Sequence, residues 1–366
     1  MNKERQRLIK KTPFFSIVMP TYGVERYLPK AIECILRQTF TDWELIIVDD
    51  CSLDSSGLIA DEYASVDERI NVIHSETNNG LSASRNIGML KSRGKYIWFP
   101  DPDDRYSEQL LQKVYEAIEC YPSVPLVMFG HAENWYKSDG SFSHRVKISF
   151  PDDALFQCKE IRAHAIELEE STQYGYAWNK VYSTSYLNAI QVLFRDIPYI
   201  EDIDFNVRVL QEISSVAVIR DILYEYAKRP SVSLTGKYNP NFFDFHKERV
   251  RLLFRQQLDW NDGKIDRDIS SRLGTIFCKY VVASLRMNCY PDAKMSFSDR
   301  RAWCNALYND ECSMELIRCS GNPRNIILTI CVKCIKRKNI FGMMAIGRAT
   351  YLVERYCYSL ISRLKN

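Results

Sequence analysis

The 366-residue sequence lacks the patterns that define several large protein classes. No apolar stretch reaches the roughly 18 residues needed to span a bilayer, and residues 1–11 are polar and basic, unlike a secretory signal. There is no internal repeat. The twelve cysteines follow no disulfide framework, so we expect reduced thiols in a cytoplasmic protein. Neither the five scattered histidines nor the pair Cys331 and Cys334 has the partners of a zinc site.

Two nucleotide-binding signatures are also missing. Residues 19–25, which follow the first apolar run, contain no Gly-x-Gly-x-x-Gly, which argues against a dinucleotide-dependent oxidoreductase. The turn at residues 20–24 has no glycine-rich phosphate loop with Arg and Lys. This weakens the case for a nucleotidyltransferase, although that class stays an alternative.

The net charge of +3 conceals a strong asymmetry. Residues 1–11 hold five Lys or Arg and one acid, and residues 321–366 hold nine and one, whereas residues 12–320 hold 35 basic and 44 acidic residues. The basic ends contain no nucleic-acid recognition module. We therefore expect no nucleic-acid partner and favour contact with an anionic membrane surface.

Residues 14–130 alternate strand and helix patterns, which predicts an α/β fold with a mostly parallel sheet flanked by helices. The predicted strands are residues 14–19, 44–48, 70–74, 96–99 and 126–129, and the predicted helices are residues 24–38, 55–65, 81–92 and 107–121. Residues 131–200 are mixed, with a helix near 159–169. A helix over 201–212 and strands over 216–219 and 222–226 follow. From about residue 241 the pattern is helical, with helices over 242–260, 265–288 and 340–364.

Polar residues collect where the predicted strands end. Thr21 follows the first strand, Asp49 and Asp50 the second, and Asp101 and Asp103 a third. Ligands of such sheets bind beyond the carboxyl ends of the strands. The segment 96–104 has three carboxylates after a short apolar run, and their repulsion calls for a divalent cation that takes further ligands from a phosphorylated substrate.

Two further segments carry candidate residues. Arg85 lies on a helix of small residues, where it either pairs with a strand-end carboxylate or steadies a phosphate. Glu201 and Asp202 begin a later helix, a position that also suits the helix dipole. Lys180 either meets a phosphate or pairs with a surface acid.

Taken in order, these segments resemble glycosyltransferase family 2. The resemblance covers residues 14–121 and rests on several motifs, which are Pro20-Thr21-Tyr22, Val48-Asp49-Asp50-x-Ser52-x-Asp54, Asn79-Gly80-x-Ser82-x-x-Arg85-Asn86-x-Gly88 and Phe99-x-Asp101-x-Asp103-Asp104. Residues 178–182 and the Glu201-Asp202 pair also resemble segments of bacterial members. Cys51 departs from the pattern because glycine is usual there, and glycine tolerates backbone angles that cysteine resists.

The resemblance implies a GT-A (Rossmann-like) fold and inverting transfer from a nucleotide-diphosphate sugar, with a UDP-sugar expected. It implies nucleotide-sugar binding by Pro20, Thr21, Tyr22, Asp50, Arg85, Asp101 and Lys180, and a site for Mn²⁺ or Mg²⁺ at Asp101 and Asp103. Asp104 would contact a sugar or support the metal site. Asp202, or its neighbour Glu201, would be the catalytic base.

The expected organisation is a basic segment (1–13), a GT-A catalytic domain (14–230, with a nucleotide-sugar part 14–130 and an acceptor part 131–230) and a helical C-terminal region (231–366). The expected enzyme is a hexosyl- or N-acetylhexosaminyltransferase that acts on a saccharide or lipid-linked saccharide in surface polysaccharide synthesis. A non-catalytic nucleotide-sugar binder is the second alternative. The basic amphipathic tail either lies on the inner face of the cell membrane or packs on protein, including a second copy in a homodimer.

Overall fold

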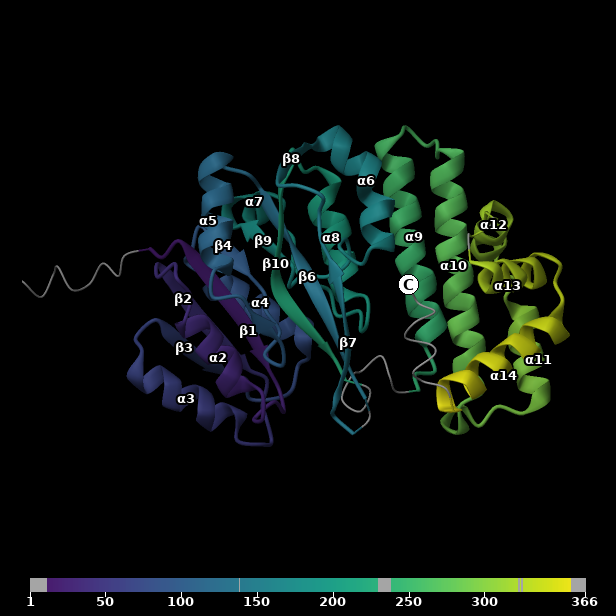
Figure 1. The fold of residues 1–366 in the computed structure, drawn as a ribbon, viewed down its shortest axis with the longest axis horizontal. Coiled ribbons are helices and arrows are strands. Elements are labelled where there is room, and N and C mark those ends of the chain that lie inside the picture. Colours follow the sequence, from purple (N-terminus) through teal and green to yellow (C-terminus); the bar gives the residue numbers. More distant parts are fainter. Residues whose placement is uncertain (1–11, 138, 230–237, 322, 324, 357–366) are drawn as a thin grey trace, which may run out of the picture. The chain divides into compact units, whose positions relative to one another are not determined.

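The chain forms two compact units in a computed structural model that describes residues 12–137, 139–229, 238–321, 323 and 325–356. The first unit comprises residues 1–197 and 201–232 and is called the sheet unit here. The second comprises residues 198–200 and 233–366 and is called the helical unit. Figure 1 shows the helices and strands of each unit.

The sheet unit is built on a ten-stranded sheet. Eight strands follow the order β3-β2-β1-β4-β9-β6-β10-β5, while β7 pairs with β6 and β8 pairs with β10 off this path. Its first half is parallel, as expected, and consists of β1 (Phe15–Thr21), β2 (Trp43–Asp49), β3 (Ile70–His74) and β4 (Tyr96–Trp98). The helices that connect these strands are α2 (Leu28–Leu36), α3 (Ser56–Val66) and α4 (Leu81–Lys91). Parallel strands end at a common edge, so the residues that follow β1, β2 and β4 meet there.

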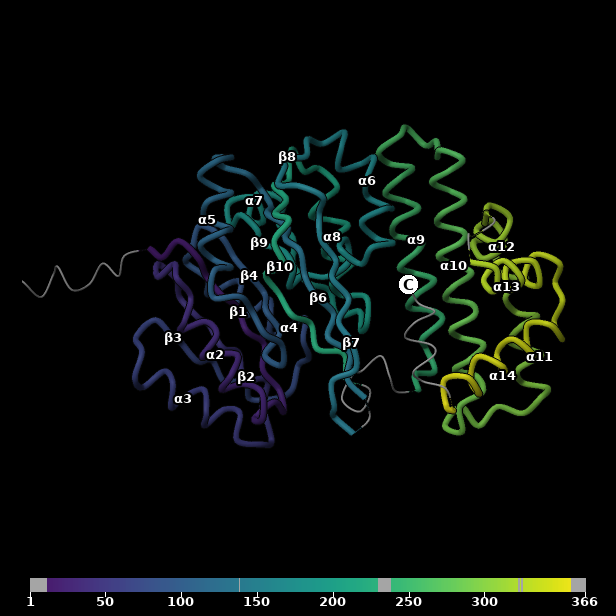
Figure 2. The backbone as a smooth tube through the Cα atoms, in the orientation of Figure 1, coloured from purple at the N-terminus to yellow at the C-terminus, as the bar shows by residue number. Residues whose placement is uncertain are grey.

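The second half of the sheet is mixed. Here β9 (Lys180–Ser183) runs antiparallel to both β4 and β6, while β6 and β10 are parallel to each other. The remaining elements are β5 (Arg105–Tyr106), α5 (Leu110–Cys120), β6 (Leu126–Tyr136), β7 (Phe142–Ile148), β8 (Ala154–Gln157), α6 (Cys158–Glu170), α7 (Thr184–Ala189), α8 (Glu201–Gln211) and β10 (Ser215–Lys228). Figure 2 shows β6 and β10 side by side although about 90 residues separate them.

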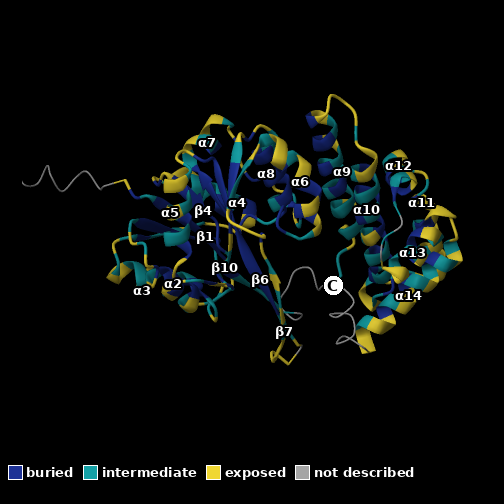
Figure 3. Cartoon of the chain, turned by 45° about the horizontal axis from the view of Figure 1, so that its top comes forward, coloured by how far each residue is buried: buried dark blue, intermediate teal, exposed yellow. Residues whose placement is uncertain are grey.

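Helices cover both faces of the parallel half. Phe15, Ile17 and Met19 of β1 belong to the same apolar core as α2 and α5, whereas Val18, on the opposite face of the strand, meets Gly88 of α4. Side chains alternate along a strand, so one apolar run supplies both faces. The central strands are accordingly buried in Figure 3, while the outer faces of the helices are exposed.

The first strand is longer than predicted. It continues through Pro20 to Thr21, which pairs with Asp49, although the pattern predicted a stop at Met19. Pairing of β1 with β4 ends at Ile17, so the amide hydrogen that proline lacks has no strand partner to lose. Similarly, the two strands predicted in residues 216–226 form the single strand β10, with register shifts near Ile222.

The helical unit consists of six α-helices and one short 3₁₀ helix among the described residues. They are α9 (Phe242–Trp260), α10 (Arg267–Met287), η2 (Pro291–Ala293), α11 (Phe297–Ala306), α12 (Glu311–Cys319), α13 (Ile326–Lys336) and α14 (Ile340–Tyr356). The predicted helix over 242–260 is confirmed to the residue. Among the described residues, none of the helices has the length and apolar character of a membrane span.

The sequence predicts an apolar stripe along the tail, formed by Tyr351, Leu352, Tyr356, Leu360 and Leu364. Of these, Tyr351 is buried, as are Met343 and Gly347 of the same helix α14, and Gly347 lies so close to α10 that an added Cβ would be 2.5 Å from the Leu285 carbonyl oxygen. Leu352 and Tyr356 are exposed. The described part of the tail therefore packs within its own unit, and predicted stripe residues beyond 356 lie outside the described residues.

We predict that Gly88→Ala destabilises the sheet unit. An alanine Cβ would lie 2.2 Å from Val18 Cγ1, and overpacking of this kind typically costs about 1–3 kcal/mol. Urea unfolding measures the loss. The double variant Val18→Ala/Gly88→Ala should be more stable than the sum of the two single losses predicts, and strictly additive losses would contradict the contact.

Candidate active site

The predicted site residues at the ends of β1 and β2 come together. Thr21 is buried, and its carbonyl oxygen accepts the amide hydrogen of Asp50 at 2.9 Å. Tyr22 is half exposed (50 %) beside it. Pro20 is buried within β1. The arrangement leaves one aromatic ring free at the sheet edge, next to buried backbone.

Asp50 organises the loop that precedes α4. Its Oδ1 accepts the amide hydrogen of Asn79 at 2.9 Å, and its Oδ2 accepts that of Gly80 at 2.7 Å. Cys51, which stands where glycine is usual, has a left-handed φ of 60°, a backbone angle that cysteine adopts less readily than glycine. Each oxygen of Asp50 thus accepts one backbone amide hydrogen and keeps one lone pair for a further hydrogen bond. Binding of the nucleobase by Asp50 stays a prediction.

Asp49 has a structural role. Its carboxylate accepts the amide hydrogen of Ser52 at 3.1 Å and bonds His74 Nδ1 at 2.9 Å. The hydrogen bond between Asp49 and the His74 ring, and a weaker effect from Asp61, raise the pKa of the imidazole. Asp49 and Asp50, at the end of β2, therefore lie in different environments.

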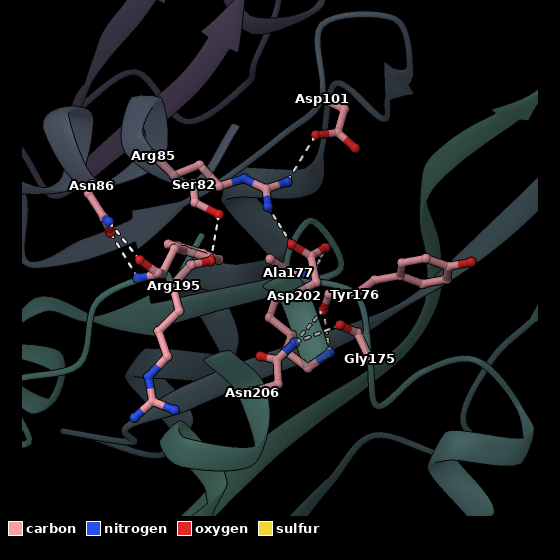
Figure 4. A network of polar contacts seen from close by, with 12 residues as sticks. Ser82, Arg85, Asn86, Asp101, Gly175, Tyr176, Ala177, Arg195, Asp202 and Asn206 are labelled. Atoms are coloured by element: carbon pink, nitrogen blue, oxygen red, sulfur yellow. Dashed lines mark hydrogen bonds and ion pairs between the residues drawn. The ribbon is translucent and has the colours of Figure 1, made fainter. Parts of the chain in front are cut away.

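Arg85 is the centre of the site. Its guanidinium is buried (1 % exposed), and it donates from Nη1 to Asp202 Oδ1 and from Nη2 to Asp101 Oδ1 at 3.2 Å (Figure 4). Burial alone would lower the pKa of Arg85, but Asp202 and Asp101 more than offset it and hold the cation charged. The ion pair predicted between Arg85 and a strand-end carboxylate is thereby confirmed.

Asp202 is held on both sides. Its second oxygen accepts the amide hydrogen of Ala177 at 3.0 Å. One helical turn later, Asn206 of α8 donates to the carbonyl oxygens of Gly175 and Tyr176 at 3.0 and 3.1 Å, which fixes the loop that carries Ala177 (Figure 4). The carboxylate therefore has a defined position opposite Asp101.

Burial changes the proton affinity of two neighbouring carboxyl groups. It raises the pKa of Asp101 to about 7, with Asp202 and Asp103 adding to the effect against Arg85. It likewise raises the pKa of Glu201 to about 7, together with Asp202. One guanidinium does not compensate this much negative charge. The site therefore favours further positive charge.

The remaining acids of the 96–104 segment have separate partners. Asp103 pairs with Arg229 Nη1 at 3.2 Å, and burial raises its pKa against that pairing. Asp104 is buried and accepts hydrogen bonds from the Tyr224 hydroxyl at 2.7 Å and the Ala227 amide at 2.8 Å. Asp104 thus ties this loop to β10.

Asp101 and Asp103 fit a divalent cation. Each carboxylate uses one oxygen for its arginine, and among the described residues the other oxygen has no hydrogen-bond partner. Carboxylate oxygens are the donors that Mg²⁺ and Mn²⁺ prefer. No group of three or more metal-binding side chains occurs among the described residues, so such an ion would take its other ligands from water and substrate.

Sequence reasoning missed a cationic hollow beside Asp103. It has a volume of about 360 Å³ and is lined by Arg26, Tyr27, Lys30, Asp103, Asp104, Arg105, Tyr136, Lys137, Gly140 and Arg229. Arg229 lies over the rings of Tyr27 and Tyr136, at 4.5 and 5.5 Å from the centroids. Arg229 directly follows β10, so the strand-end argument used for β1, β2 and β4 would have found it.

The structure places Lys180 in an environment that the sequence did not predict. It is fully buried (0 % exposed), so the predicted surface ion pair is wrong. Its ammonium donates to the carbonyl oxygens of Gln173 and Tyr176 at 2.7 and 2.6 Å, and to Asn179 Oδ1 at 2.8 Å. Burial lowers its pKa to about 7 against Asp202 and Glu169. Binding of a donor phosphate stays a prediction that would require these bonds to be exchanged.

Comparisons with known proteins show what this chain is similar to. Residues 16–149 match Glycosyl transferase family 2. The uncharacterised glycosyltransferase EpsJ of Bacillus subtilis is 33 % identical over 229 residues, which are 62 % of this chain and 65 % of EpsJ. The putative teichuronic acid biosynthesis glycosyltransferase TuaG of the same organism is 36 % identical over 106 residues, 29 % of this chain and 42 % of TuaG. The matches thus cover less than two thirds of these relatives' own lengths.

A solved structure extends the likeness over most of the chain. TarS 1–349 of Staphylococcus aureus in complex with UDP-GlcNAc aligns with a TM-score of 0.61 at 19 % identity, and the alignment covers 92 % of this chain and 91 % of that one. The architecture is therefore that of the GT-A glycosyltransferases, as predicted. Over residues 16–149 the chain is thus similar in sequence to glycosyltransferase family 2.

We predict that Lys180→Met destabilises the sheet unit by at least about 3 kcal/mol, because three buried oxygen acceptors lose their donor while the side-chain volume is kept. Urea unfolding is the measurement. Lys91→Met, at an exposed position of α4, is the matched control. Equal stability of the two variants would contradict the structural role.

Proposed function

We propose that this chain transfers a sugar from a nucleotide-diphosphate sugar to the hydroxyl group of a saccharide or lipid-linked saccharide, with inversion at the anomeric carbon. The observation that carries the proposal is the buried Arg85, which joins the candidate metal ligand Asp101 to the candidate base Asp202. The match of residues 16–149 to glycosyltransferase family 2 supports the reaction class. The UDP-GlcNAc bound to TarS supports a UDP-sugar donor, and a hexose or N-acetylhexosamine as the sugar. The similarity to TuaG, a putative teichuronic acid biosynthesis glycosyltransferase, supports an acceptor that belongs to a surface polysaccharide.

The donor would lie across the edge of the parallel strands. The exposed ring of Tyr22 offers a stacking surface for the base, with Thr21 and Asp50 at the edge of the nucleoside. Asp101 and Asp103 would hold Mn²⁺ or Mg²⁺, which when bound neutralises charge on the leaving diphosphate.

The cationic hollow beside Asp103 suits the leaving diphosphate. Among the described residues, Arg26, Lys30, Arg105 and Lys137 make no ion pair with a carboxylate, so their charge is available to phosphate oxygens. Arg229 pairs with Asp103 and would turn to the diphosphate when the carboxylate binds metal.

The proton of the acceptor hydroxyl would pass to Asp202. The ion pair with Arg85 and the hydrogen bond from Ala177 hold this carboxylate in one orientation. This reduces the entropy that must be lost to reach a reactive geometry. Glu201, whose pKa of about 7 also suits a base near neutrality, is the competing candidate. The hydroxyl attacks opposite the leaving group, which gives inversion in a single displacement.

We predict that Asp202→Asn lowers kcat by at least about 10²-fold and leaves the Kd for UDP-sugar within about threefold. Glu201→Gln, the matched control with the same change of chemistry one residue away, should retain most turnover. Release of UDP measures turnover, and calorimetry measures binding. Loss of turnover in Glu201→Gln alone would transfer the role of base to Glu201.

We predict that Asp103→Ala abolishes the part of UDP-sugar affinity that depends on Mn²⁺ while the free energy of unfolding changes little. Calorimetry with and without Mn²⁺ is the measurement, and Asp139→Ala, on an exposed turn, is the control. Metal-dependent binding without any UDP release in the wild-type chain would indicate a non-catalytic binder instead. Unchanged metal dependence in Asp103→Ala would refute the metal site.

A further inference from the structure

The helical unit contains a second cationic hollow. It has a volume of about 310 Å³ and lies among the end of α10, η2, α11 and the C-terminal half of α14, lined by Cys289, Tyr290, Pro291, Lys294, Met295, Arg300, Arg348, Tyr351, Leu352, Arg355 and Tyr356. All of these residues belong to the helical unit. The hollow is therefore defined without reference to the sheet unit or to the reaction proposed above.

The charge of this hollow is of one sign. Lys294, Arg300, Arg348 and Arg355 line it, the lining contains no Asp or Glu, and within the described part of the chain none of these four forms an ion pair. Glu354, the one acid on α14, does not line the hollow, because it accepts a hydrogen bond from the Tyr290 hydroxyl at 2.5 Å and pairs with Arg286 at 3.2 Å. Cations gathered in a concave surface without acids produce a strong positive potential.

The arginines are oriented rather than merely adjacent. Arg355 Nη1 donates to the Tyr351 hydroxyl at 2.9 Å, while the Arg348 guanidinium lies 5.4 Å from the centroid of the Tyr351 ring. Tyr351 is buried and thus a fixed support. Burial raises the pKa of the Cys289 thiol, and the positive charges of Arg300 and Arg348 act against this rise. A guanidinium carries five N–H donors, so its one hydrogen bond to a described residue leaves Arg355 further donors for a ligand.

The chemistry of the lining selects the ligand. Guanidinium groups match the oxygen geometry of phosphate and donate in pairs. Leu352 and Tyr356, the latter 72 % exposed, add an apolar rim that suits the carbon part of a phosphate ester. We propose that this hollow binds the phosphate group of a ligand, carried either by a membrane lipid headgroup or by a soluble phosphate ester.

The test is calorimetric titration of the full chain with inorganic pyrophosphate at low salt. The background is Arg26→Gln/Lys30→Gln, which removes positive charge from the hollow beside Asp103 and so limits binding of the probe at the sheet unit. Arg300→Gln/Arg348→Gln should weaken pyrophosphate binding by at least about tenfold, because two charge-assisted contacts are lost. Lys333→Gln/Arg337→Gln, with the same charge change at exposed positions of the same unit, should bind like the parent. Circular dichroism confirms equal folding of the variants.

Vesicle sedimentation distinguishes the two sources of phosphate. Hollow-dependent binding to vesicles of phosphatidylglycerol and phosphatidylcholine, but not to phosphatidylcholine alone, assigns the phosphate to a lipid headgroup. Pyrophosphate binding that depends on the hollow without such vesicle binding assigns it to a soluble ester. The proposal is overturned if the parent does not bind pyrophosphate, or if the two double variants bind it equally. Sugar transfer is not measured, so failure here leaves the proposed function untouched.

Discussion

The candidate site depends on one buried guanidinium. Arg85 on α4 reaches Asp101 after β4 and Asp202 at the start of α8, three segments that are separate in sequence. A guanidinium buried to this degree is stable only while both carboxylates stay in place. The same contact therefore stabilises the fold and fixes the distance between the two acids that the proposed reaction uses.

Negative charge is the second constraint. Asp101, Asp103, Asp104, Glu201 and Asp202 crowd one edge of the sheet, and burial raises the pKa of the first three and of Glu201. The structure distributes compensation among Arg85, Arg229 and hydrogen bonds from β10. The compensation is incomplete at Asp101 and Asp103, because burial raises the pKa of both carboxyl groups although each is paired with an arginine. A site of this kind gains stability when a cation and an anionic substrate arrive together.

The two units divide the charge of the chain. Residues 233–366 hold 23 Lys and Arg against 12 Asp and Glu, a net charge of +11, while the whole chain carries +3. The sheet unit gathers acids at the candidate active site. The helical unit instead has a hollow lined by four cations that form no ion pair with any described residue.

The parallel half of the sheet, its helices and the strand-end position of Asp50, Asp101 and Asp103 follow from the sequence, because periodicity and chain breakers act over short distances. Only tertiary structure decided the partners of Arg85, the burial of Lys180 and the contact of Asp103 with Arg229 across 126 residues. Those outcomes depend on which segments pack together, since burial and electrostatic pairing are properties of the assembled fold and leave no local pattern in the sequence.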